Sequence, residues 1–417
     1  MVVVVGLDPG SDQSENGLHL LDGIKDVEIQ PFMPDRPVVA LDVGVLLRLA
    51  GLDVGQGDAL LLGPVREPGP GFRETLSRRA YQEPRGKPES LMARITLIVL
   101  AYVFLSATAL ISLTEATAAT IFTIPEVAPV TMAYFAASSW PALAGILLYI
   151  AVFRNADLLP RVRQAVILLM LCSLFFPAFT ITKTHLSAIV PFYADPWLAE
   201  LDAALHFGQD PWRLAHALQG EAVTAFGVWL YHDLWLIPAM FMPVILRLVD
   251  DDDARVMRFI YLYFLTWIVL GNLVALGLMS AGPVYYDRLF EAGRFAGLGQ
   301  VLAEIDAPRL TGFQEFLWDN YANGRQSAGS GISAFPSVHI GMVTVWALYI
   351  AERFPRATPL SVALVVVYTF YSVYLGWHYA IDAYFSTLVL VLAWGALRSL
   401  KGQERTVAPL LQDQDIG

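Results

Sequence analysis

Eight apolar segments of membrane-spanning length follow one another from Leu91 onward, and they constrain the fold more than any other feature of the sequence. The composition agrees, because 56% of the residues are apolar and 16% are charged, whereas soluble domains carry about 25% charged residues. The sequence therefore predicts an all-α, polytopic membrane protein with about eight transmembrane helices. The expected spans are residues 91–113, 131–153, 164–183, 222–246, 259–281, 336–352, 359–377 and 380–397.

The segments outside the spans carry less information. Residues 36–64 could form a strand, a short helix and a second strand, and residues 66–90 have the Pro, Gly and charge content of a flexible linker. The acidic run at 250–253 is expected to be a solvated loop. The net charge of −11 argues against a nucleic-acid partner, which requires a basic face. The single cysteine, Cys172, excludes an intramolecular disulfide.

Lysine and arginine concentrate in alternate connections between the spans. By the positive-inside rule, those connections and both termini are expected in the cytoplasm. His339, at the start of the sixth span, then lies at the external face of the membrane. His378 and Asp382, between the seventh and eighth spans, lie at the same face. Two long external loops, 184–221 and 282–335, are positioned to cover this point, and loops of such length are usually functional.

These three polar residues have the chemistry of a phosphoryl-transfer site. His378 and Asp382 are four residues apart, so on a helix they share a face. The carboxylate could accept the Nδ1 proton of the imidazole, fix its tautomer and leave Nε2 free as a nucleophile. His339 follows Pro336 and Ser337 at a helix start, where open backbone N–H groups can bind an anion. A second histidine there could serve as an acid and base.

Each element of this set also has a plainer interpretation. His339 alone could be a packed, hydrogen-bonded residue of a membrane helix. The pair of His378 and Asp382 could be a structural hydrogen bond. The three side chains could also form a facial metal triad, although no further ligand is evident. The combination is more specific than any of its parts, and we expect neither a metal nor a cofactor.

Two stretches of the sequence resemble a known family. "AFPSVH" (334–339) and "YSVYLGWHYAIDAY" (371–384) are similar to the second and third motifs of the type 2 phosphatidic acid phosphatase superfamily. They look most like its branch that contains fungal inositol phosphorylceramide synthase and sphingomyelin synthases. The resemblance implies that His378 is the phosphoryl-accepting nucleophile, that Asp382 orients it, and that His339 is the acid and base.

Further stretches extend this resemblance over about residues 164–400. It implies a six-helix catalytic core at 164–400, two extra transmembrane helices at 91–163, an N-terminal region at 1–90 and a cytoplasmic tail at 401–417. The stretches concerned are "YHDLW" (231–235), "LMSAGPVYYDRL" (278–289) and "FYADPWLAELDAALHFGQDPW" (192–212).

The departures from the superfamily pattern concern mainly its cations. Val338 replaces the glycine of the PSGH motif, Tyr371 and Ser372 stand where the pattern has Ser-Arg, and no Lys-six-residues-Arg-Pro motif occurs. Fewer cations suit a phosphodiester, which carries one negative charge, better than a phosphate monoester dianion. Arg288, Arg325 or Lys183 could supply a cation from the external loops. The expected substrate-binding residues are Ser337, Ser372, Tyr285, Arg288, Arg325, Lys183 and His232.

The resemblance therefore implies an integral membrane phosphotransferase with its active site on the external face. It would move a phospho-headgroup, with phosphoinositol as one candidate, from a phospholipid donor to a lipid alcohol acceptor through a phosphohistidine. One alternative is a lipid or polyprenyl phosphate phosphatase, in which water is the acceptor. A second alternative is a non-catalytic transporter or scaffold, although a transporter is expected to show internal repeats or broken spans, and the sequence has no repeat.

The topology can be tested by labelling a new cysteine. A cysteine placed at Gly299, in a protein whose Cys172 has been replaced, should react with a membrane-impermeant thiol reagent in intact cells, because the loop at 282–335 is expected outside. Labelling that occurs only after lysis would contradict this orientation.

Overall fold

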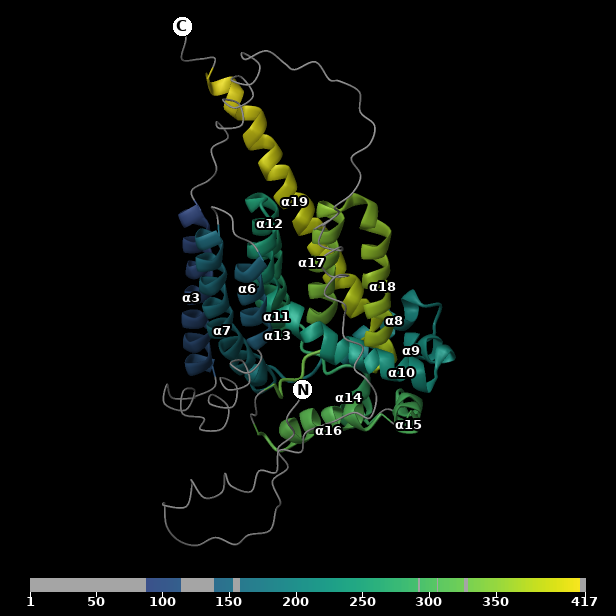
Figure 1. Ribbon diagram of the computed structural model, residues 1–417. Coiled ribbons are helices and arrows are strands. Elements are labelled where there is room, and N and C mark those ends of the chain that lie inside the picture. The colour runs from purple at the N-terminus through teal and green to yellow at the C-terminus, as the bar shows by residue number, and fades with distance from the viewer. Residues whose placement is uncertain are drawn as a thin grey trace, which may run out of the picture. The chain divides into compact units, whose positions relative to one another are not determined.

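The computed structural model describes residues 88–113, 139–152, 158–291, 293–305, 307–325 and 329–412. By its contacts the chain divides into two units, Met1–Glu83 and Pro84–Gly417. The strands and helix predicted at 36–64 lie outside the described residues, as does the start of the second span at 131–138. Within the described residues, all regular structure is helical (Figure 1).

The predicted spans coincide with helices, which confirms an all-α, multi-pass membrane protein. Six helices are long and apolar enough to cross a membrane, whereas α17 has 16 residues and the described α6 has 13. Two spans are longer than predicted: α7 extends beyond 164–183 at both ends, and α19 continues past 397 and rises beyond the other helices (Figure 1). The spanning helices are α3 (Pro88–Leu113), α6 (Trp140–Val152), α7 (Leu158–Ile189), α10–η2–α11 (Glu221–Val228, Trp229–Leu234 and Trp235–Val249), α12–η3–α13 (Asp253–Phe264, Leu265–Val274 and Ala275–Gly277), α17 (Val338–Arg353), α18 (Thr358–Tyr374) and α19 (Ala380–Gln412).

Helix α17 is surrounded by other helices of the bundle. It packs against α18, α19, α12 and η3, and Ile340, Met342 and Val343 on it are completely buried. Gly341 allows the closest of these contacts, since a Cβ atom there would lie 2.7 Å from the Thr266 methyl group of η3. Because α17 is short and buried, its first turn is held in place from several sides.

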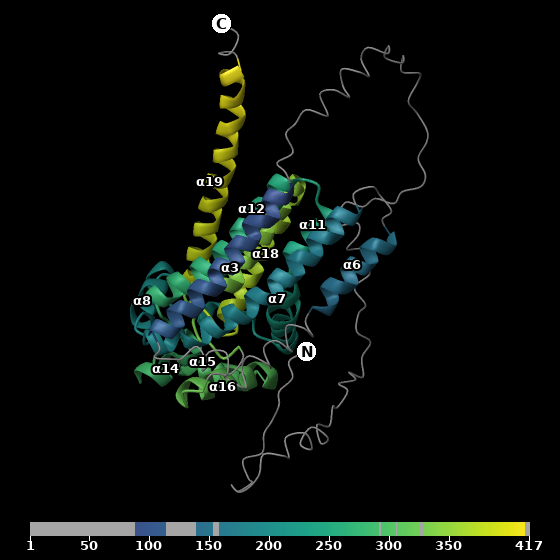
Figure 2. The ribbon, with the colours of Figure 1, turned by 90° about the vertical axis from the view of Figure 1, so that its left-hand side faces the viewer.

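The two long loops fold as short helices that cover one end of the bundle. In both views α14, α15 and α16 lie below the end at which α17 begins and α18 ends (Figure 1, Figure 2). Four of the six short helices in these loops begin with proline in the first turn, where the backbone needs no N–H donor. The cap helices are α8 (Asp195–Leu205), α9 (Pro211–Ala215), η1 (His216–Leu218), α14 (Pro283–Phe290), α15 (Ala296–Glu304) and α16 (Pro308–Ala322).

The cap contacts the turn between α18 and α19 directly. The Gln314 side chain of α16 donates to the Leu375 carbonyl at 3.0 Å, and the Val284 amide of α14 donates to the Gly376 carbonyl at 3.1 Å. His216 of η1 bonds through Nε2 to the Tyr374 carbonyl at 2.8 Å. The prediction that both loops cover this point is therefore confirmed.

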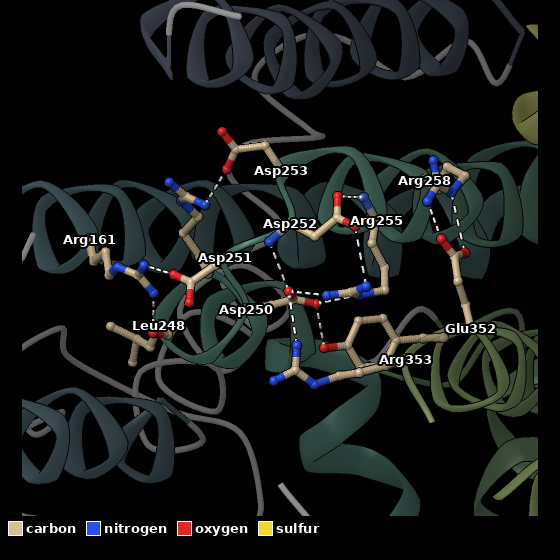
Figure 3. A network of polar contacts seen from close by, with 12 residues as sticks. Arg161, Leu248, Asp250, Asp251, Asp252, Asp253, Arg255, Arg258, Glu352 and Arg353 are labelled. Carbon is tan, nitrogen blue, oxygen red and sulfur yellow. Dashed lines mark hydrogen bonds and ion pairs between the residues drawn. The ribbon is translucent and has the colours of Figure 1, made fainter. Parts of the chain in front are cut away.

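The acidic run at the opposite end of the bundle is not a solvated loop, and that prediction is wrong for Asp250. Asp250 is completely buried, because the short connection between α11 and α12 turns it inward against α17 (Figure 3). Its carboxylate accepts hydrogen bonds from Arg255 at 2.5 and 2.7 Å and from Tyr349 at 2.7 Å, and pairs with Arg353 at 3.0 Å. Burial would raise the pKa of Asp250, but these donors hold it below the ordinary value. The network therefore ties α12 to the end of α17.

We expect Asp250→Ala to destabilise the protein by about 3–5 kcal/mol, because two arginines would remain at a buried site without their carboxylate. Asp251→Ala is the matched control. Its side chain is 80% exposed beside Arg161, so its loss should cost less than about 1 kcal/mol. Thermal unfolding in detergent measures both, and equal midpoints for the two variants would contradict a stabilising role of this network.

Candidate active site

The structure brings His339, His378 and Asp382 together at the capped end of the bundle. His339 lies in the first turn of α17, His378 in the turn between α18 and α19, and Asp382 in the first turn of α19. The Nδ1 atom of His378 is 3.1 Å from a carboxylate oxygen of Asp382. The rings of His339 and His378 have centroids 6.4 Å apart. Among the described residues, no three His, Cys, Asp or Glu side chains are arranged to hold a metal ion.

Ser337 connects the two histidine motifs. It is the N-cap of α17, where its hydroxyl accepts the Ile340 amide at 3.3 Å. The same oxygen is 3.2 Å from Nε2 of His378. With the imidazole proton on Nδ1, facing Asp382, Nε2 carries a lone pair and the Ser337 hydroxyl donates to it. Pro336 was expected within the first turn of α17 but precedes the cap.

Val338 fits in place of a glycine because a glycine faces it from the neighbouring helix. A Cβ atom on Gly271 of η3 would lie 3.1 Å from a methyl group of Val338 and 3.1 Å from the ring of Phe179. The space that Val338 fills is thus provided by the missing side chain at 271.

The turn that carries His378 is fixed by backbone contacts. The Ser372 carbonyl accepts the amides of Trp377 at 3.1 Å and His378 at 3.2 Å. Gly376 has φ +76°, which glycine adopts readily. Gly282 approaches so closely that a Cβ atom would lie 2.5 Å from the Trp377 carbonyl oxygen. The Ser372 hydroxyl, which was expected to bind substrate, donates to the Thr369 carbonyl at 2.8 Å. Ser372 therefore contributes to the site through its backbone carbonyl.

Asp195 of α8 joins two loops of the site, a role that the sequence did not reveal. It is completely buried, and burial raises its pKa while its hydrogen-bond donors oppose this shift. The donors come from the loop before α14 and from the residue after His378. They are the Ser280 hydroxyl at 2.9 Å, the amides of Ala281 and Gly282 at 2.8 Å, and the Tyr379 hydroxyl at 3.0 Å.

Asp202, two turns further along α8, caps the helix that carries Asp382. Its carboxylate accepts the amides of Ala380 at 3.2 Å and Ile381 at 3.0 Å, the first two residues of α19. Burial raises the pKa of Asp202 to about 6, although both amides oppose the shift. A carboxylate at this position also complements the positive end of the α19 dipole.

Of the three expected cations, Lys183 is the one whose charge acts on the two histidines of the site. Its ammonium donates to the Gly271 carbonyl at 3.1 Å and is close enough for its charge to act on both His339 and His378. It lines a cavity of about 150 Å³ together with Phe179, Thr180, Gly329 and Gly331. Arg288 forms two hydrogen bonds with the carboxylate of Glu315 on α16, and the bond from Nη1 is 2.9 Å long. Arg325 is exposed near the end of α16.

The two remaining candidates lie where the bundle meets the cap. Tyr285 is buried and donates to the Gln314 carbonyl at 2.9 Å, so it fastens α14 to α16. His232 packs between Phe313 and Trp377, with ring centroids 5.9 and 5.8 Å away. Its Nε2 atom is buried and has no hydrogen-bond partner among the described residues.

Residues 196–396 match the family model of the PAP2 superfamily. The match runs from α8 to α19, lies within the residues that the sequence assigned to the core, and contains both histidines and Asp382. The match agrees, for this region, with the superfamily that the two histidine motifs resemble. No curated protein and no solved structure matches the chain.

The raised pKa of Asp202 predicts a pH-dependent stability. Its value of about 6 in the folded protein lies above about 3.9 in the unfolded chain. The stabilising effect of protonation is therefore present at low pH and lost as the pH rises through 6. Between pH 5 and pH 8, the wild type should lose about 1 kcal/mol of unfolding free energy relative to Asp202→Asn.

Glu200→Gln is the control for this experiment. It also removes an acidic side chain from α8, but one that is 77% exposed. Unfolding in detergent at the two pH values measures the difference of each variant from the wild type. An Asp202→Asn difference that does not change between the two pH values, or that changes only as the control does, would contradict the proposed burial of charge.

Proposed function

We propose that the chain is an integral membrane phosphotransferase that moves the phospho-headgroup of a phospholipid to a lipid alcohol. The match to a superfamily of phosphatases and phosphotransferases supports the reaction class. The observation that carries the proposal is the pairing of His378 with Asp382 through Nδ1, at 3.1 Å, with Nε2 turned toward the start of α17. A neutral imidazole held in this tautomer is a nucleophile, and burial lowers the pKa of His378 so that it stays neutral.

The proposed reaction consists of two displacements at phosphorus. In the first, Nε2 of His378 attacks, the bond between phosphorus and the diacylglycerol oxygen breaks, and His339, which begins the cycle as the imidazolium, gives that oxygen a proton and becomes neutral. In the second, His339 takes the proton of the incoming hydroxyl, the new P–O bond forms, and the P–N bond breaks. Asp382 stabilises the positive charge that develops on His378, as the carboxylate does in a catalytic triad. The ring centroids of His339 and His378 are 6.4 Å apart, so both side chains could contact one phosphoryl group.

The charges around the site support a diester donor. Lys183 is the expected cation whose charge acts on both histidines, and the open amides at the start of α17 add a partial positive charge. Arg288 is committed to Glu315. One cation and a helix N-terminus suit the single negative charge of a phosphodiester, whereas a monoester dianion would need more.

The cap supports transfer to an alcohol rather than to water. Gln314 and Val284 bind the turn that carries His378, so α14 and α16 cover this end of the bundle. A covered site protects a reactive phosphohistidine from hydrolysis. We therefore place the acceptor hydroxyl on a lipid, and phosphoinositol remains one candidate for the headgroup.

The adduct is the most direct test. Purified protein incubated with a phospholipid labelled in its headgroup phosphate should acquire acid-labile, base-stable label on His378. His378→Ala should lose both the label and turnover. Asp382→Asn should keep the fold but lose turnover by about 10³- to 10⁴-fold, because the imidazole takes the wrong tautomer. His206→Gln, a histidine of the cap whose ring is bonded to Tyr384, should remain active.

The products distinguish transfer from hydrolysis. With a panel of diester and monoester donors and added alcohols, a new phosphodiester lipid should form, and diesters should react faster. If the protein instead released inorganic phosphate from monoesters faster than it formed a phosphodiester lipid, the assignment would change to a phosphatase. Near-normal turnover by His378→Ala would show that the two histidine motifs do not form one active site.

A further inference from the structure

His339 lies between two aromatic side chains of one helical segment. Its ring centroid is 4.3 Å from that of Tyr231, with 6° between the planes, and 3.8 Å from that of Trp235, with 21° between the planes. Two rings this close and this nearly parallel to the imidazole would overlap if they lay on the same side. Tyr231 and Trp235 therefore occupy opposite faces of His339.

The local helix geometry explains the placement. Tyr231 lies in η2, a π-helical segment with a wider turn than an α-helix, and Trp235 begins α11. Such segments are rare and often occur at functional sites. Trp235 also donates from Nε1 to the His339 carbonyl at 3.1 Å. It thus holds both the ring and the backbone of His339.

We propose that Tyr231 and Trp235 form an aromatic clamp that positions His339 for proton transfer. This inference rests on the proposed function, because it assigns a role within the acid and base steps of His339. The clamp prevents the imidazole from turning about its side-chain bonds, so its ring edge, and the nitrogen that carries the proton, keeps one direction relative to the reacting oxygen. The π-faces of both rings also stabilise the imidazolium that carries the proton before the first displacement and again after the hydroxyl is deprotonated.

The clamp works through the aromatic rings, so the Tyr231 hydroxyl is a separate feature. This hydroxyl is buried beside Ser337 and forms no well-aligned hydrogen bond with any described residue. Tyr231→Phe keeps the stacked ring and is therefore the conservative variant. Trp235→Phe likewise keeps a ring on the other face.

The test compares two phosphodiester donors that differ in their leaving group. An alkyl alcohol needs a proton as it leaves, whereas nitrophenolate does not. Trp235→Leu and Tyr231→Leu should lose alkyl turnover by about 10- to 100-fold through misplacement of the acid, with nitrophenyl turnover changed by less than about threefold. Tyr231→Phe should restore the wild-type ratio, and Trp235→Phe should lie between.

Trp346→Leu is the matched control. Trp346 is on α17 like His339, is as buried as Trp235, at 7% against 6% exposed, and packs against Tyr368. Its loss should leave the ratio of the two rates unchanged. Because only the ratio is compared, a variant that folds in lower yield still reports on the clamp.

The outcomes separate the clamp from the proposed function. One outcome overturns the clamp alone. In it, His339→Ala lowers only the alkyl rate, but Trp235→Leu and Tyr231→Leu keep the wild-type ratio of alkyl to nitrophenyl rates, whether or not both rates fall. The two rings would then be core packing alone. Alkyl and nitrophenyl rates that both survive His339→Ala would overturn the acid and base role of His339, and the clamp with it.

Discussion

A buried carboxylate is unstable unless hydrogen bonds compensate it, and α8 carries two such carboxylates. Asp195 and Asp202 are both buried and are satisfied chiefly by backbone amides of the loops that form the site. The buried amides also require acceptors, and these carboxylates supply them. Each of three elements therefore depends on the position of the others: α8, the loop before α14 and the start of α19.

Helix α17 is fixed at both ends by polar contacts of different kinds. At its first turn, Ser337 meets His378 and the Ile340 amide. At its last turn, Arg353 pairs with the buried Asp250, and Glu352 binds Arg258 and Trp394. Apolar contacts between membrane helices leave sliding and rotation open, whereas these directional bonds do not. The 16 residues between them therefore hold His339 at a defined height and rotation.

The sequence predicted what depends on local patterns. Apolar runs located the spanning helices, and the spacing of His378 and Asp382 predicted the contact between their side chains. The expectation that both lie on one helix face is wrong, because His378 lies in the turn before α19. The hydrogen-bond donors to Asp195, the α19 amides at Asp202, and Tyr349 at Asp250 are distant in the sequence, and no local pattern predicts these contacts. The π-helical turn that aligns Tyr231 with Trp235 has no pattern of its own, because apolar periodicity does not resolve one extra residue in a turn.

The contact between Val338 and Gly271 makes two distant positions interdependent. A side chain at 271 would meet Val338 and Phe179 at 3.1 Å, so the bulk allowed on one helix is set by the residue on the other. The superfamily motif has a glycine at the position of Val338. In this chain the glycine of the contact lies on η3 instead, at position 271. Substitutions at these two positions should be epistatic: exchanging them together conserves volume, whereas changing either alone creates a clash or a void.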